Sequence, residues 1–82
     1  MTINKSLNEL KPGEKGVVKA LLLEESMKRR LQDIGLIMNS NVVGIGTSPL
    51  GNPSAYLIKG TVIAIRNEDS KKIQVECMSR HS

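Results

Sequence analysis

The chain has 82 residues, enough for one small domain, and 12 basic against 8 acidic residues give it a net charge of +4. It contains no Phe, no Trp and one tyrosine, Tyr56, so it lacks the side chains that usually stack on bases or line a groove for proline-rich peptides. Its one cysteine, Cys77, excludes an intrachain disulfide, and no apolar run reaches the roughly 18 residues of a membrane span.

These exclusions define the expected class of protein. Without a disulfide, an apolar leader or a membrane span, we expect a cytoplasmic protein that does not insert directly into a membrane. The shortage of aromatic side chains predicts that it binds no nucleic acid. We expect a single domain over residues 1–78 and a flexible tail over residues 79–82.

A short helical turn is the first predicted element. Ser6 and Glu9 have the spacing of a capping box, and Pro12 with Gly13 ends the turn. The turn is expected to place Leu7 and Leu10 in the core. A first strand is then predicted over the mostly aliphatic residues 16–23.

An amphipathic helix is predicted over about residues 24–34. Apolar side chains recur there at helical spacing, at Leu23, Met27, Leu31 and Ile34. Gly35 follows as a residue able to take the left-handed conformation that ends a helix. Arg29 and Asp33 are four residues apart, a spacing that allows an ion pair on the helix surface.

The rest of the chain predicts strands alternating with turns. Four further strands are expected, over residues 42–47, 55–59, 61–66 and 72–77. Turn-forming residues separate them, at residues 39–41, 48–53, 60 and 67–70. Gly44 and Gly46 lie inside a predicted strand and indicate a bulge or a close backbone approach. The pattern predicts a mainly β fold, a small antiparallel barrel of about five strands with one inserted α-helix and a short N-terminal helical turn.

No arrangement of side chains in the sequence is suited to catalysis. Hydrolysis or acyl transfer needs a nucleophile, a base and a group that orients the base, and the one histidine, His81, lies in the tail. The adjacent carboxylates Glu24 and Glu25 point apart on a helix, and Glu68 with Asp69 lies in a polar turn. We therefore predict no enzyme, no catalytic residue and no cofactor-binding residue.

The sequence also predicts no metal-ligand set. Cys77 and His81 are its only soft ligands, and Cys77 is expected to lie in the core as a small apolar side chain. Two ligands, one of them in a mobile tail, hold a metal weakly. A site of carboxylates, from Glu9, Glu24 or Glu25, stays open as an alternative, although no spacing argues for it.

Two features suggest contacts with a partner. The helix carries Arg29 and Arg30, and an apolar Leu50 projects from a loop between Pro49 and Pro53. A stiff loop loses little entropy on binding, so a projecting leucine is suited to an interface. The alternatives are an ordinary charged helix face and a rigid hairpin loop. We nominate Arg29, Arg30, Pro49, Leu50 and Pro53 as partner-binding residues.

Several blocks of the sequence together resemble the ferrous iron transport protein A (FeoA) family. They are LKPGEKGV at 10–17, RRLQDIGL at 29–36, SPLG at 48–51, GTVIAIR at 60–66 and IQV at 73–75. The resemblance extends over about residues 7–75. It departs at Asn39, where the family usually has glycine, but asparagine also tolerates the left-handed conformation.

The resemblance implies an SH3-like barrel with an inserted helix. It also implies a small cytosolic accessory protein of ferrous iron uptake, which binds and modulates the membrane ferrous iron transporter through the transporter's cytosolic GTP-binding part. The alternative function is a metal- or ligand-sensing SH3-like regulatory domain, because similar domains lie at the C-termini of iron- or manganese-dependent repressors. On that alternative a divalent cation such as Fe2+ would bind weakly. No other cofactor and no particular oligomeric state is implied.

Overall fold

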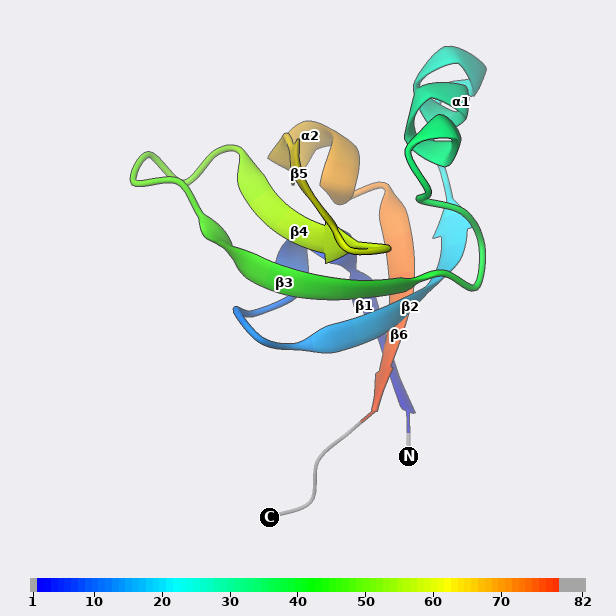
Figure 1. Cartoon of the computed structure of the whole chain (residues 1–82). Helices are drawn as coiled ribbons and strands as arrows, with labels where there is room; N and C mark the ends of the chain where they lie inside the picture. The colour runs from blue at the N-terminus through cyan, green and yellow to red at the C-terminus, as the bar shows by residue number, and fades with distance from the viewer. Residues whose placement is uncertain (1, 79–82) are drawn as a thin grey trace.

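The computed structural model describes residues 2–78, in which six antiparallel strands form one curled sheet in the order β1-β6-β2-β3-β4-β5 (Figure 1). The strands are β1 (Thr2–Ser6), β2 (Lys15–Leu21), β3 (Asn41–Thr47), β4 (Ser54–Ile58), β5 (Thr61–Ile65) and β6 (Ile73–Met78). The helices are the 3-10 turn η1 (Leu7–Glu9), α1 (Glu25–Asp33) and the short α2 (Asn67–Ser70). The predicted tail over 79–82 lies outside the described residues.

The strand count differs from the prediction by one, because β1 was missed. β1 pairs with β6 over its whole length, from Thr2 opposite Met78 to Ser6 opposite Gln74. Its residues are largely exposed and do not alternate between apolar and polar. Such an edge strand is held by backbone pairing, so it carries little of the period-two signal that identifies the others. The segment at 67–70, predicted as a polar turn, forms the single helical turn α2.

The core is aliphatic and is built around one aromatic side chain, Tyr56, which is 1% exposed. η1 buries Leu7 and Leu10, as the sequence predicted, and Cys77 is buried among the same side chains. The other members come from β2, α1, the segment between α1 and β3, and the strands β3 to β6, namely Val18, Leu21, Leu31, Leu36, Val42, Ile58, Ile65, Ile73 and Val75.

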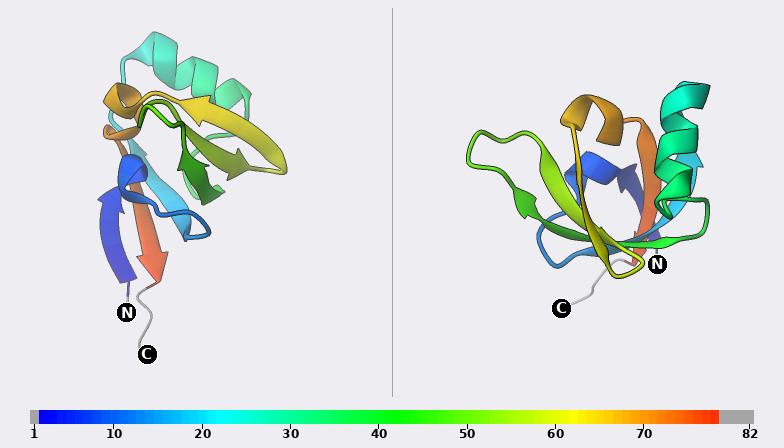
Figure 2. Two further views of the ribbon diagram at one scale, coloured as in Figure 1. Left: turned by 90° about the vertical axis from the view of Figure 1, so that its left-hand side faces the viewer. Right: turned by 45° about the horizontal axis from the view of Figure 1, so that its top comes forward.

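The helix α1 begins and ends within one residue of its predicted bounds. Leu31 is its buried residue, while Leu23 and Met27 pack partly against the core. Gly35 follows with φ +105 and Asn39 with φ 70, which confirms the left-handed backbone expected at both positions. Figure 2 shows α1 beside the curled sheet, where it follows the end of β2.

A close backbone contact holds the turn before β2 against β3. Gly13 N donates to Gly44 O at 2.7 Å, and Gly44 N donates to Glu14 O at 2.9 Å. A Cβ atom on Gly44 would lie 2.6 Å from the carbonyl oxygen of Lys11, closer than such atoms approach. The pairing of β3 with β4 shifts register between Gly44 and Gly46, so the predicted bulge and close approach are both present.

The contact predicts that substitutions at Gly44 and Gly46 change stability by different amounts. Gly44→Ala is expected to lower the free energy of unfolding by at least about 2 kcal/mol, because the new methyl group forces the Lys11 carbonyl away. Gly46→Ala is the control, because its Cβ would meet nothing within 4 Å. That variant is expected to change stability by less than about 1 kcal/mol. Urea denaturation measures both, and equal losses would contradict the close-approach explanation.

Candidate functional site

The loop between β3 and β4, residues 48–53, presents Leu50 to solvent. Leu50 is 92% exposed, more than any other large apolar side chain among the described residues. The loop is closed on itself, because Gly51 N donates to Ser48 O at 2.7 Å and Asn52 N donates to Ser48 Oγ at 3.1 Å. Ser48 N donates to Pro53 O at 3.1 Å across its base. The leucine is therefore displayed on an ordered support.

A second set of hydrogen bonds ties this loop to α2. Asn67 N donates to Asn52 Oδ1 at 3.0 Å, and Asn67 Nδ2 donates to Gly51 O at 2.9 Å. The sequence analysis missed Asn67, because its partners lie 15 and 16 residues away along the chain. Its one local signal is an asparagine at the start of a helix, where such side chains commonly bond backbone groups. The loop is thus held from both its own base and the neighbouring helix.

A groove of about 420 Å³ lies between α1 and the sheet edge at β5. Its lining is apolar with charged residues added, and consists of Met27, Arg30, Leu31, Ile34, Ile63, Ala64, Ile65, Arg66 and Asp69. Ile34, expected on the buried face of the helix, is instead 45% exposed in this groove. The helical period correctly places Ile34 on the inner face of α1, but nothing in the structure fills the space opposite it.

The predicted partner-binding residues divide between two places. Arg30 lines the groove and also, with Arg29 and Asp33, a shallow hollow on the outer surface of α1, whereas Arg29 lies only on that outer surface. Within residues 2–78 the one ion pair joins other side chains, so the Arg29–Asp33 pair is not formed. Pro49, Leu50 and Pro53 are exposed in the loop at 48–53. Figure 1 places α2 between that loop and α1, so the arginines and Leu50 do not share one patch.

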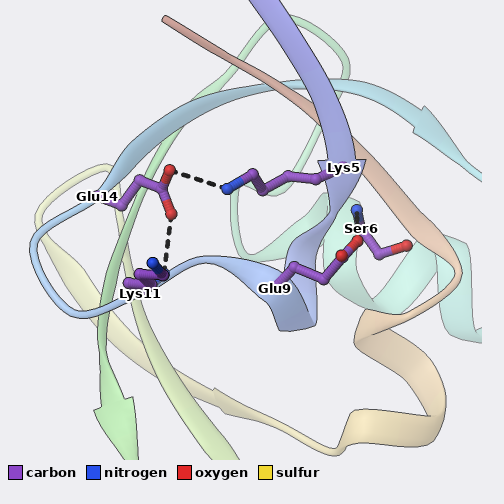
Figure 3. Close-up of polar contacts among 5 residues, drawn as sticks. All are labelled: Lys5, Ser6, Glu9, Lys11 and Glu14. Atoms are coloured by element: carbon purple, nitrogen blue, oxygen red, sulfur yellow. Dashed lines mark hydrogen bonds and ion pairs between the residues drawn. The ribbon is translucent and has the colours of Figure 1, made fainter. Parts of the chain in front are cut away.

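The one ion pair of the described residues links β1 to the turn before β2 (Figure 3). Lys5 Nζ lies 3.0 Å from Glu14 Oε2, and the backbone N–H of Lys11 donates to Glu14 Oε1 at 3.0 Å. The Lys11 N–H and then the Lys5 ammonium hold the pKa of Glu14 below its ordinary value, and Glu14 raises the pKa of Lys5. Both charges are used in holding the fold together.

The other carboxylates and the thiol form no metal centre in this part of the chain. Glu9 Oε1 accepts a hydrogen bond from Ser6 N at 2.8 Å, which is one half of the predicted capping box. No three side chains among His, Cys, Asp and Glu of residues 2–78 come together, so the alternative site of Glu9, Glu24 and Glu25 is not assembled. Burial raises the pKa of the Cys77 thiol. His81, the other soft ligand of the sequence, lies outside the described residues.

Neither α1 nor α2 has the length and apolar character that a helix of the described chain would need to cross a bilayer.

The FeoA domain family matches residues 5–77 of the chain. A Campylobacter jejuni relative named as Fe(2+) transport protein A is 30% identical over 70 residues, which are 85% of this chain and 95% of the relative. A Porphyromonas gingivalis relative is named as an Fe(2+) transport protein A/Fe(2+) transporter FeoB fusion protein. It is 26% identical over 76 residues, 93% of this chain, and the chain spans 9% of its length.

Solved structures share the fold. The FeoA protein from Chlorobium tepidum has a TM-score of 0.87 and 27% identity, over 94% of this chain and 73% of that one. FeoA from Stenotrophomonas maltophilia, solved as a zinc complex and described as a procaryotic SH3 domain protein, has a TM-score of 0.70 and 26% identity. That match covers 85% of this chain and 87% of the other. The predicted SH3-like fold is confirmed, with six strands instead of five.

The two-sided support of the loop predicts what Asn67→Ala would do. Losing the bond to Gly51 O is expected to lower the free energy of unfolding by about 1 kcal/mol and to speed hydrogen exchange at Gly51. Glu68→Ala, an exposed neighbour on α2, serves as the control and is expected to leave the exchange rate unchanged. Exchange rates measured by NMR decide the matter, and an unchanged rate in Asn67→Ala would show that the loop orders itself.

The Lys5–Glu14 ion pair predicts a pH-dependent stability difference. Glu14 has a folded pKa below its ordinary value of 4.5, so its stabilisation is complete above that pH and is lost as pH falls through the lower folded pKa. Glu14→Gln is therefore expected to lower stability by up to about 1 kcal/mol at pH 7. Chemical denaturation from pH 7 to pH 2 should show the difference from the unmodified chain vanishing at the acid end, whereas a constant difference would contradict the assignment.

Proposed function

Because the chain belongs to the FeoA domain family, we propose that it is a small cytoplasmic accessory protein that binds the membrane ferrous iron transporter through that transporter's cytosolic GTP-binding part and modulates it. The family places the chain in ferrous iron transport. The chosen partner, its GTP-binding part and the cytoplasmic location belong to the proposal. On this proposal the chain acts by binding its partner.

One observation carries the proposal. In the Porphyromonas gingivalis protein, a region similar to this chain is named as fused to the Fe(2+) transporter FeoB. A covalent link raises the effective concentration of two modules for each other. Two modules joined in one polypeptide are therefore natural binding partners when they occur as separate chains, which supports a direct complex between this chain and such a transporter.

The loop at 48–53 supplies the surface we propose for that contact. A fully exposed leucine on an ordered loop can insert into an apolar pocket without first losing much conformational entropy. Arg29 is exposed on the outer face of α1 and can meet acidic groups of the same large partner. Because α2 separates the two positions, the partner must be broad enough to reach both.

A second function rests on the zinc complex of the Stenotrophomonas maltophilia protein. On this alternative the chain is a regulatory domain that senses a divalent metal. The ligands would have to include groups outside the described residues or from a second molecule, because residues 2–78 hold no cluster of three ligands. Anaerobic calorimetric titration with Fe2+ distinguishes the functions, since stoichiometric metal binding without the transporter favours sensing.

The transporter proposal predicts a loss of affinity in Leu50→Asp. The variant places a charge where an apolar side chain enters the interface, so the Kd for the transporter's isolated cytosolic GTP-binding part should rise about tenfold or more. Arg29→Glu should raise the Kd and reduce its salt dependence. Calorimetry or fluorescence anisotropy measures both, and Leu22→Asp, which also puts a charge on an exposed leucine, is the matched control.

Each outcome has a distinct meaning. If Leu50→Asp and Arg29→Glu both bind as tightly as the unmodified chain, the proposed surface is wrong. If the unmodified chain shows no saturable binding to the transporter's cytosolic part, the proposed partner is wrong.

A further inference from the structure

β5 is an edge strand whose own sequence and pairing carry none of the charges, prolines or bulges that often protect such strands. It pairs with β4 on one side, from Ile58 opposite Thr61 to Ser54 opposite Ile65, and with no described strand on the other. Its sequence, TVIAI, has no charge and no proline, and its pairing shows no bulge. Natural edge strands are commonly blocked by one of these devices, since a bare edge is a template for a further strand.

The turn between β4 and β5 determines which backbone groups are free. It has two residues, Lys59 with φ 50 and Gly60 with φ 78, so the residues that flank it form a hydrogen-bonded pair. Alternation along the ladder then directs the N–H and C=O groups of Val62 and Ala64 away from β4. Both residues are exposed, Val62 to 61%. Two complete sets of donors and acceptors thus face outward.

The groove beside this edge offers an apolar surface for side chains. Met27 of α1 and Ile34, the residue that follows the helix, line it opposite Ile63, which is half-buried. Residues of α1 and β5 line the groove together, so its apolar side chains lie next to the free edge of β5. In an extended segment paired with β5, every second side chain would lie on the Ile63 side and reach this apolar surface.

The charges around the groove favour an acidic segment as the binding partner. Arg30 and Arg66 both line it, against one carboxylate, Asp69. Neither arginine is in ion-pair contact within the described chain. A second copy pairing through β5 about a two-fold axis would bring both sets of arginines to the same face, which costs repulsion. A segment with acidic side chains gains attraction instead.

We propose that β5 and its groove form a docking site for an extended acidic segment of a partner protein, which adds to the sheet next to β5 and places its apolar side chains between α1 and Ile63. This is strand addition, in which backbone pairing gives affinity and the groove gives preference. The site is formed by other residues than the loop at 48–53 and goes beyond the transporter contact proposed above. It does not depend on that proposal.

A synthetic peptide tests the site without knowledge of the natural partner. The probe is the blocked heptapeptide Glu-Thr-Ile-Thr-Ile-Thr-Glu, whose glutamates and isoleucines share one face of an extended strand. It is titrated into isotope-labelled full-length chain and followed by NMR and hydrogen exchange. We expect saturable binding, with slower exchange at the amides of Val62 and Ala64. The same peptide with lysine at every glutamate position should bind about tenfold more weakly or worse, because it meets Arg30 and Arg66.

Backbone pairing is tested on the peptide, so that folding of the protein is not disturbed. One peptide is N-methylated at its threonines, and a second at its glutamates and isoleucines. A paired strand directs alternate amides to its neighbour. One of the two peptides should therefore lose affinity about tenfold, while the other keeps it. Equal affinities would overturn the strand-addition proposal.

Protein variants and self-association complete the test. Arg66→Glu should weaken the acidic peptide about tenfold, while Lys15→Glu, an exposed cation outside the groove, should leave its affinity unchanged. Absence of binding to the unmodified chain, or equal affinity for the acidic and basic peptides, would overturn the proposal. Sedimentation that shows dimers with protected Val62 and Ala64 amides would assign the edge to a second copy instead. None of these outcomes bears on binding to the transporter, so the two proposals fail separately.

Discussion

The approach of the Lys11–Glu14 turn to Gly44 is the contact on which the rest of the sheet depends. Two backbone hydrogen bonds connect the turn to β3, at a point where a side chain on Gly44 would collide with the Lys11 carbonyl. Glu14 reinforces the turn through Lys11 N and Lys5, which also connects it to β1. The position of β3 therefore depends on the missing side chain of Gly44 as much as on these hydrogen bonds.

Both proposed binding surfaces follow from how the chain continues after β3. The bulge at Gly44–Gly46 bends the strand, and the loop at 48–53 follows it before β4 returns. β5 then forms the end of the sheet, and α2 binds the loop through Asn67. A small aliphatic core is enough to hold the loop and the edge strand in place. Neither surface requires a buried reactive side chain.

The sequence predicted the parts of the fold that have a local signal. The apolar repeat identified α1, and the backbone preference of asparagine identified the turn at Asn39. β1 was missed because a polar edge strand is defined by its neighbour. Asn67 was missed because its partners are distant in the chain. The helical period places Ile34 on the apolar face of the predicted helix. It does not indicate whether another element packs against that side chain, so the groove was not predicted.

We propose that the chain acts by binding the cytosolic part of a ferrous iron transporter. The most direct test of this proposal is an NMR titration of the isotope-labelled chain with that part of the transporter. The account predicts saturable chemical-shift changes concentrated in the loop at 48–53 and on the outer face of α1. Absence of saturable changes, or changes confined to β1 and β6, would contradict it.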